Sequence, residues 1–79
     1  MATRLTLKYD GEADILYIDR RPPHADQETE ELGDDIIARI DPTTGEIDTL
    51  EVLFFSTRLL RTDLVELPVG ASLSLVAAG

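Results

Sequence analysis

The stretch that decides the fold is Tyr9-Asp10-Gly11-Glu12-Ala13-Asp14-Ile15-Leu16-Tyr17-Ile18. Leu5 and Leu7 precede this stretch and Tyr9 begins it, and these apolar residues alternate with polar ones. This period of two is typical of a half-buried strand. A polar segment with a glycine follows, which indicates a turn, and the apolar run after it indicates a second strand. The stretch therefore predicts a β-hairpin.

The length of the turn decides which side chains share a face of this hairpin. A four-residue loop places Tyr9 opposite Leu16, whereas a five-residue loop moves Ile15 and Tyr17 to the face of Tyr9. A shift of one residue exchanges the two faces, and the pattern is compatible with both registers. In either register the second strand is apolar on both sides, so we expect something to cover each face of the sheet.

The next segment predicts a break and then a polar edge strand. Pro22 and Pro23 cannot donate hydrogen bonds to a sheet, which places them in a loop or at an exit from an edge. In the acidic segment that follows, Gln27, Thr29 and Glu31 form the alternating pattern of a short polar strand. Charges on an edge strand discourage pairing with other chains.

Two further apolar runs, residues 36–40 and 47–55, predict a second hairpin. The loop between them, residues 42–45, has proline early and glycine late, as turns of type I prefer. This loop sets Arg39 opposite Asp48, and an opposite-charge pair across two strands contributes about 0.2–1 kcal/mol.

The end of the chain predicts one helix and an extended tail. Ser56 or Thr57 can cap a short helix that runs from Thr57 to about Thr62. Residues 64–70 predict extended chain ended by a turn, and residues 71–76 a weak final strand or an apolar tail.

Together these elements predict an α+β fold. We expect a small antiparallel β-sheet of four to six strands, built from two hairpins, with one short α-helix on one face. The length suits a single domain over residues 1–79, with a β-rich core over residues 5–56 and the short helix plus apolar tail over residues 57–79.

Composition limits the classes of function. The chain has no cysteine, which excludes disulfides and cysteine-based metal sites, and its start has no apolar signal core. No apolar run is long enough to cross a bilayer, so we expect a cytoplasmic protein without a membrane partner. The formal net charge of -9 repels nucleic-acid phosphates. Such a charge keeps a protein in solution, and the alternative is that it attracts a basic partner protein.

The first hairpin resembles the domain of unknown function 2283 family, small bacterial proteins with the pattern Y-D-x-E-A-D-x-L-Y-I. The matching residues are Tyr9, Asp10, Glu12, Ala13, Asp14, Leu16, Tyr17 and Ile18. A second block resembles the family's D-x-x-x-G-x-I-x-G-I-E-I-L, and its matching residues are Asp41, Gly45, Ile47, Leu50, Glu51, Val52 and Leu53. Thr49 stands where the family usually has glycine, and Phe54-Phe55 replaces a more polar pair. The resemblance implies a small β-rich domain with a short helix and implies no activity.

The turn of the first hairpin carries three carboxylates, those of Asp10, Glu12 and Asp14. Such oxygens suit a hard divalent cation, but the later glycine and the bidentate glutamate of a calcium loop are missing. Aspartates that accept backbone N–H groups explain the turn without a ligand. We therefore expect these carboxylates to stabilise the turn. The alternative is that the protein binds a divalent metal or a small ligand through them, or is an enzyme that uses them.

The remaining polar residues predict no catalytic site. His24 is the only histidine, and with no cysteine to accompany it we expect an exposed side chain without a catalytic or metal-binding role. The serines lie outside any G-x-S-x-G motif, and no glycine-rich phosphate loop is present. We therefore predict no catalytic residues, no cofactor and no enzymatic activity.

The apolar residues instead indicate an interface. Adjacent strand residues point to opposite faces, so one of Phe54 and Phe55 should pack under the helix and the other should face a second layer. That layer is either a second subunit or the tail. With Ile15 and Tyr17 these phenylalanines form the predicted interface of a homodimer. The leading hypothesis is a non-enzymatic protein-interaction module, with a possible antitoxin-like role as the acidic partner of a basic protein.

Overall fold

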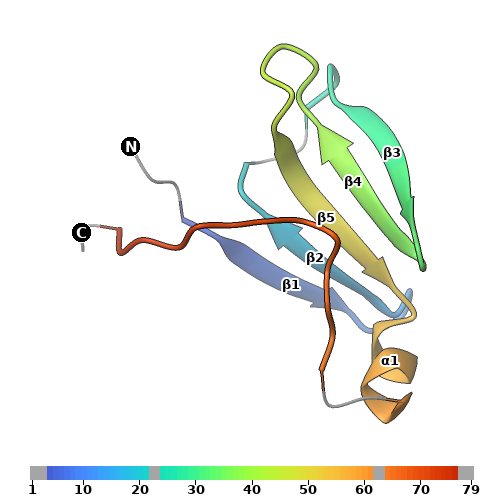
Figure 1. Ribbon diagram of the computed structural model, residues 1–79. Coiled ribbons are helices and arrows are strands. Elements are labelled where there is room, and N and C mark those ends of the chain that lie inside the picture. The colour runs from blue at the N-terminus through green and yellow to red at the C-terminus, as the bar shows by residue number, and fades with distance from the viewer. Residues whose placement is uncertain (1–3, 22–23, 62–63, 77–79) are drawn as a thin grey trace.

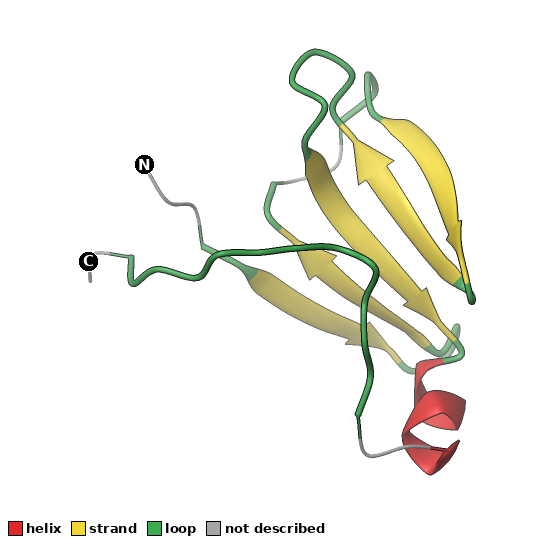
Figure 2. Cartoon of the chain, viewed as in Figure 1, coloured by secondary structure: helices red, strands yellow, loops and turns green. Residues whose placement is uncertain are grey.

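The computed structural model describes residues 4–21, 24–61 and 64–76. It contains one antiparallel sheet with the strand order β1-β2-β5-β4-β3, followed by one helix (Figures 1 and 2). The elements are β1 (Thr6–Asp10), β2 (Ile15–Asp19), β3 (Glu28–Gly33), β4 (Ile36–Ile40), β5 (Ile47–Leu53) and α1 (Phe55–Arg61). Five strands and a short helix confirm the predicted α+β class.

The first hairpin has the register of the four-residue loop. Tyr9 lies opposite Leu16, and Leu7 lies opposite Ile18. The turn is closed by the Asp10 carboxylate, whose Oδ1 accepts the backbone N–H groups of Glu12 at 3.0 Å and Ala13 at 3.2 Å. The structure thus decides between the two registers that the sequence allowed.

The core lies on one side of the sheet, where β2, β5 and β4 are neighbours. Ile18, Leu50 and Ala38 form one row across these strands, and Val52 and Ile36 pair in the next. Ala38, Ile36 and Val52 are almost completely buried. We call this side the core face, and its position follows from the pairing of β2 with β5, which joins the two predicted hairpins.

Residues 64–76 form the only described layer over the core face. They contain no strand, so the apolar-tail alternative holds, and they run across the sheet in front of β5 and β2 (Figure 1). Leu67 and Val69 pack against the core cluster of Ile36, Ala38 and Leu50. The first part of the tail therefore covers the core face within the same chain.

The two edges of the sheet differ in character. β3 is one edge and carries Glu28, Glu30 and Glu31, in agreement with the predicted polar edge strand. β1 is the other edge, and its apolar side chains Leu7 and Tyr9 are exposed beside it.

The second hairpin corrects one predicted pair. Ile40 lies opposite Ile47, but Arg39 lies opposite Thr49 because a bulge shifts the register between Arg39 and Ile40. The predicted pairing of Arg39 with Asp48 is therefore wrong. A bulge gives one strand an extra residue, and here the Arg39 guanidinium instead donates to Glu51 at 3.0 Å.

The start of the helix is the second correction. β5 ends at Leu53 and α1 begins at Phe55, so Phe54 and Phe55 are not strand residues as predicted. Phe54 has a φ of 54°, in the left-handed region, and this turns the chain out of the sheet. The helix lies beyond the end of β5, next to the β1–β2 turn (Figure 1). Thr62, the predicted last helical residue, and Pro22-Pro23 lie outside the described residues.

Replacement of Leu67 by alanine should lower the free energy of unfolding by about 1–2 kcal/mol. This leucine is only partly buried against the core, and complete burial of a leucine contributes about 1.5–3 kcal/mol. The measurement is urea denaturation followed by circular dichroism.

Leu60→Ala is the matched control for this test. Leu60 is 88% exposed on α1, so its replacement should change the free energy of unfolding by no more than about 0.5 kcal/mol. Equal effects of the two substitutions would show that the tail does not cover the core.

Candidate functional site

Asp14, one of the three turn carboxylates, is bound to the start of the helix. Its Oδ1 accepts the Tyr9 hydroxyl at 2.6 Å and the backbone N–H of Ser56 at 2.9 Å, and its Oδ2 accepts the Ser56 hydroxyl at 2.8 Å. The first N–H groups of a helix have no partner inside the helix, so Asp14 acts as the cap. The predicted cap, Ser56, lies in the first turn and is itself a donor to Asp14.

These hydrogen bonds change the acidity of both side chains. The bond from the Tyr9 hydroxyl, followed by the two bonds from Ser56, lowers the pKa of Asp14, because each donor stabilises the carboxylate. The bond to Asp14 raises the pKa of the Tyr9 hydroxyl. Asp14 is therefore a charged structural group at neutral pH.

The structure uses two of the three turn carboxylates for folding. Asp10 closes the turn and Asp14 caps the helix, while Glu12 is exposed on the turn. Over residues 4–21, 24–61 and 64–76, the one group of three side chains spaced for a metal ion lies elsewhere. The turn-stabilising interpretation of Asp10 and Asp14 thus has direct geometric support.

A second group of polar residues surrounds Asp48, at the opposite end of the sheet. Asp48 is 1% exposed, and its Oδ2 accepts the Gln27 side-chain amide at 3.0 Å and lies 3.4 Å from Nε2 of His24. The hydrogen bond from Gln27 is the main cause of a lowered Asp48 pKa, which burial opposes and His24, Arg21 and Arg20 support. The carboxylate is therefore charged, although it is buried.

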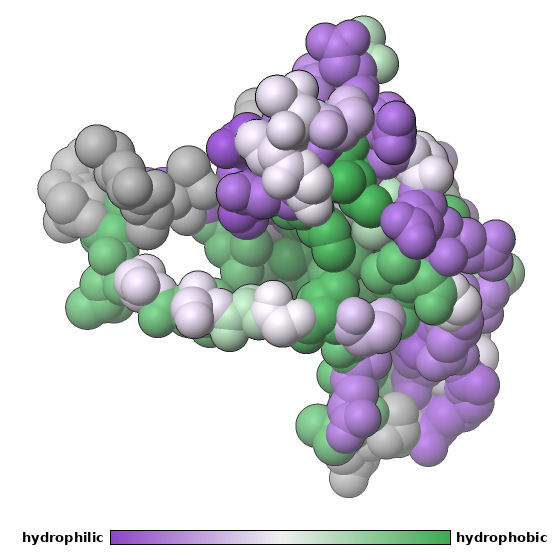
Figure 3. Space-filling model, turned by 45° about the horizontal axis from the view of Figure 1, so that its top comes forward, coloured by the Kyte–Doolittle hydropathy of each residue, from purple (hydrophilic) through white to green (hydrophobic). Residues whose placement is uncertain are grey.

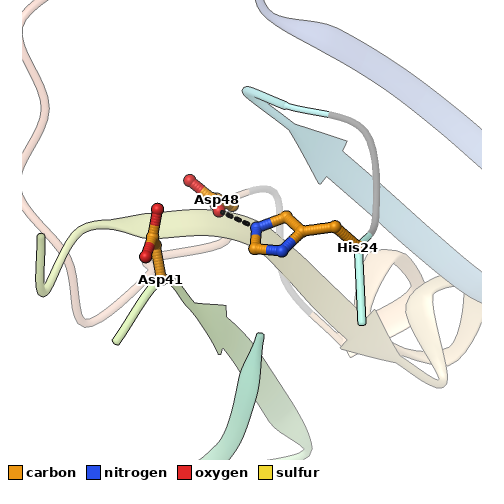
Figure 4. A group of neighbouring side chains, drawn as sticks. All are labelled: His24, Asp41 and Asp48. Carbon is orange, nitrogen blue, oxygen red and sulfur yellow. Dashed lines mark hydrogen bonds and ion pairs between the residues drawn. The ribbon is translucent and has the colours of Figure 1, made fainter. Parts of the chain in front are cut away.

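His24, Asp41 and Asp48 come together in this group (Figure 4). One potential ligand atom from each lies within 4.8 Å of the others. We expected His24 to be exposed and to lack a catalytic or metal-binding role. It is exposed, but its imidazole lies beside two carboxylates. The strand topology could have predicted this group. In this antiparallel sheet, β2 and β4 end where β3 and β5 begin, so residues from all four strand ends lie near one another.

The side of the sheet opposite the core face carries a second apolar set. The register places Ile15, Tyr17, Ile37 and Leu53 on this side, and each is partly buried. No helix or strand of the described residues packs over it (Figures 1 and 2). We call this side the open face, and the described residues supply no second layer there.

The four residues of the predicted interface lie on different elements of the structure. Ile15 and Tyr17 lie on the open face, whereas Phe54 is exposed at the junction of β5 and α1. Phe55 packs against Tyr9, with ring centroids 6.0 Å apart. Phe54 lies in a turn and Phe55 in a helix. The alternation of side chains between the two faces of a strand therefore does not determine where these two rings point.

Two highly exposed leucines of the tail lie outside that predicted set. Leu73 is 83% exposed and Leu75 is 100% exposed, at the far end of the tail. We call residues 71–76 the apolar arm. Figure 3 shows the tail standing away from the rest of the molecule, with apolar atoms behind it. An exposed apolar segment of this kind commonly marks a contact with another molecule.

The geometry defines a small α+β domain that has one open sheet face and an exposed apolar arm. The family model for proteins of unknown function (DUF2283) matches residues 6–56, more than half of the chain, and the chain belongs to this family. This confirms the resemblance found in the two sequence blocks. Neither a curated protein nor a solved structure shows significant similarity to the chain. Among the described residues, no helix has the length and apolar character needed to cross a membrane.

Replacement of Asp14 by asparagine should lower the melting temperature at neutral pH. The Asp14 pKa is lower in the folded chain, so its stabilising effect is complete above the ordinary aspartate value of 3.8 and is lost as the pH falls through the lower, folded value. Thermal melts from pH 7 to pH 2 should therefore show a weaker loss of stability in acid for Asp14→Asn than for the natural chain.

Glu12→Gln serves as the control, because it removes a carboxylate from the same turn without touching the helix cap. Its acid profile should follow that of the natural chain. A parallel acid profile for Asp14→Asn would contradict a role of the Asp14 charge in the helix cap.

Proposed function

We propose that the protein is a non-enzymatic protein-interaction module that forms a homodimer and binds a basic protein through its acidic edge. The observation that carries the homodimer is the apolar arm. Its residues Ser72, Leu73, Ser74 and Leu75 alternate like a half-buried strand, yet no strand forms and both leucines are exposed. The arm thus has the pattern of a strand and lacks a partner strand among the described residues.

The β1 edge of a second copy offers that partner. β1 pairs on one side only, so its other side presents unpaired backbone groups, and Leu5 and Leu7 are exposed beside it. An added strand binds such an edge through backbone hydrogen bonds and buries alternate side chains. Leu73 and Leu75 of one copy would extend the apolar core face next to Leu7 of the other. Each leucine that becomes fully buried contributes about 1.5–3 kcal/mol.

The acidic edge supports the second part of the proposal. It consists of Asp26, Glu28, Glu30, Glu31, Asp34 and Asp35, along and around β3. Over the part of the chain that the structure describes, Asp34 is the one member of this set paired with a cation, at 3.2 Å from Arg58. The chain as a whole has a formal net charge of -9, so this edge attracts a basic protein surface and repels phosphate groups. An antitoxin that neutralises a basic toxin is one role of this kind.

The non-enzymatic character rests on how the candidate chemical groups are used. Of the turn carboxylates Asp10, Glu12 and Asp14, Asp10 and Asp14 are occupied by the turn and the helix cap, which leaves only Glu12 exposed on the turn. The exposed surface is apolar on the arm and acidic on β3, and surfaces of these two kinds suit contacts with proteins.

The double substitution of Leu73 and Leu75 by serine should convert a dimer into a monomer. Light scattering coupled to size-exclusion chromatography measures the mass directly. Leu60→Ser is the matched control, because Leu60 is equally apolar and exposed but lies on α1. A natural chain that runs as a monomer, or a double variant that remains a dimer, would rule out the proposed homodimer.

Replacement of Glu30 and Glu31 by lysine should abolish capture of a basic protein from native lysate. The natural chain is expected to recover such a protein, and the recovery should fall as the salt concentration rises, because exposed charges are screened. Glu12→Lys, on the first hairpin turn, changes one charge outside the edge and should retain the partner. Recovery of no protein other than the chain itself would contradict the proposed basic partner.

A further inference from the structure

The Asp48 carboxylate has an unused acceptor in a buried position. Its side chain has no exposed surface, and Oδ1 accepts no hydrogen bond from the described residues. The nearest cationic atoms are Nη2 of Arg20 at 3.6 Å and Nε of Arg21 at 3.9 Å, both beyond hydrogen-bonding distance. A buried charged oxygen without a hydrogen bond costs free energy, which a bound cation at that oxygen would recover.

Two further ligand types lie next to the Asp48 carboxylate. The His24 imidazole and the Asp41 carboxylate each place an atom within 4.8 Å of an Asp48 oxygen and of one another. Figure 4 shows the three side chains converging from a loop, the end of β4 and the start of β5. One imidazole nitrogen and two carboxylate oxygens are a ligand set that Zn²⁺ and related first-row divalent ions accept.

Gln27 orients the Asp48 carboxylate and contacts the backbone of His24. Its side-chain amide donates to Oδ2 of Asp48 at 3.0 Å, and its carbonyl oxygen accepts the backbone N–H of His24 at 3.4 Å. The Asp48 carboxylate is therefore held through Oδ2, while Oδ1 faces the two arginines without a hydrogen bond from the described residues. Residues that orient ligands in this way are characteristic of metal sites and tune their affinity.

The two arginines are the natural competitors of a bound cation. Arg20 forms an ion pair with Glu46, and Arg21 lies 3.5 Å from Oδ2 of Asp41. Three carboxylates, those of Asp41, Glu46 and Asp48, therefore face two guanidinium groups, which leaves one negative charge. Both arginine side chains are partly exposed, so they can move into solvent when a cation enters.

From this geometry we propose that His24, Asp41 and Asp48 form a binding site for a first-row divalent cation, with coordination positions left for water or a partner's ligand. Three protein ligands with an open position are the arrangement of zinc sites that bind a further group. The site lies at the end of the sheet opposite to α1 and is independent of the proposed dimer contact.

The test is calorimetric titration of Zn²⁺ into the untagged, full-length chain. We expect saturation at one ion per chain, with an affinity that falls about tenfold or more in His24→Gln and in Asp41→Asn. Both variants change partly exposed side chains, and asparagine retains the oxygen that accepts the Thr43 N–H in the loop. Glu12→Gln is the matched control and should bind Zn²⁺ like the natural chain. No saturable binding, or equal binding by His24→Gln, would overturn the proposal.

Arg21→Gln separates a metal site from a purely structural ion-pair network. Removal of a competing cation should raise the Zn²⁺ affinity several-fold, whereas a structural network would only lose stability. As His24 is the only histidine, its ring signals in a nuclear magnetic resonance spectrum report on this site alone. They should shift on addition of Zn²⁺, and unchanged ring signals at saturating Zn²⁺ would exclude His24 as a ligand.

Discussion

The carboxylate of Asp14 connects the two halves of the fold. It lies in the first hairpin turn, and it accepts hydrogen bonds from Tyr9 in β1 and from Ser56 in α1. The carbonyl oxygen of the same residue accepts the N–H of Phe55 at 3.1 Å. A helix as short as α1 forms poorly on its own, because few hydrogen bonds offset the cost of the first turn. Its position therefore depends on this contact with the hairpin.

The position of the helix determines which surfaces are covered. The left-handed turn at Phe54 and the cap by Asp14 place α1 beyond the end of the sheet rather than over the open face. The chain then returns across the core face, where Leu67 and Val69 complete the core. The open face keeps its partly buried apolar residues, and the apolar arm continues past the sheet. The exposure of the open face and of the apolar arm thus follows from the position that the cap gives to α1.

The opposite end of the sheet is organised by a second buried carboxylate. Because of the bulge between Arg39 and Ile40, Asp48 is not paired with Arg39 as predicted. Its carboxylate instead contacts Gln27 and His24. Asp14 and Asp48 both have a lowered pKa, but for different reasons. All the acceptor oxygens of Asp14 are engaged by the fold, whereas Oδ1 of Asp48 accepts no hydrogen bond from residues 4–21, 24–61 and 64–76. This difference assigns a structural role to the first and makes the second a candidate ligand.

The sequence by itself determined the strands, the two hairpins and the polar edge, since period-two patterning and turn residues are local signals. The family followed from the residues of the two hairpins, which the match over residues 6–56 confirms. Only the tertiary structure decided the register of β1 and β2, the bulge at β5 and the identity of the helix cap. Asp14 and Ser56 are distant in the sequence, as are His24 and Asp48, and no local pattern encodes such pairs. The sequence indicated single carboxylates and a lone histidine, and the folded sheet determined which of them meet.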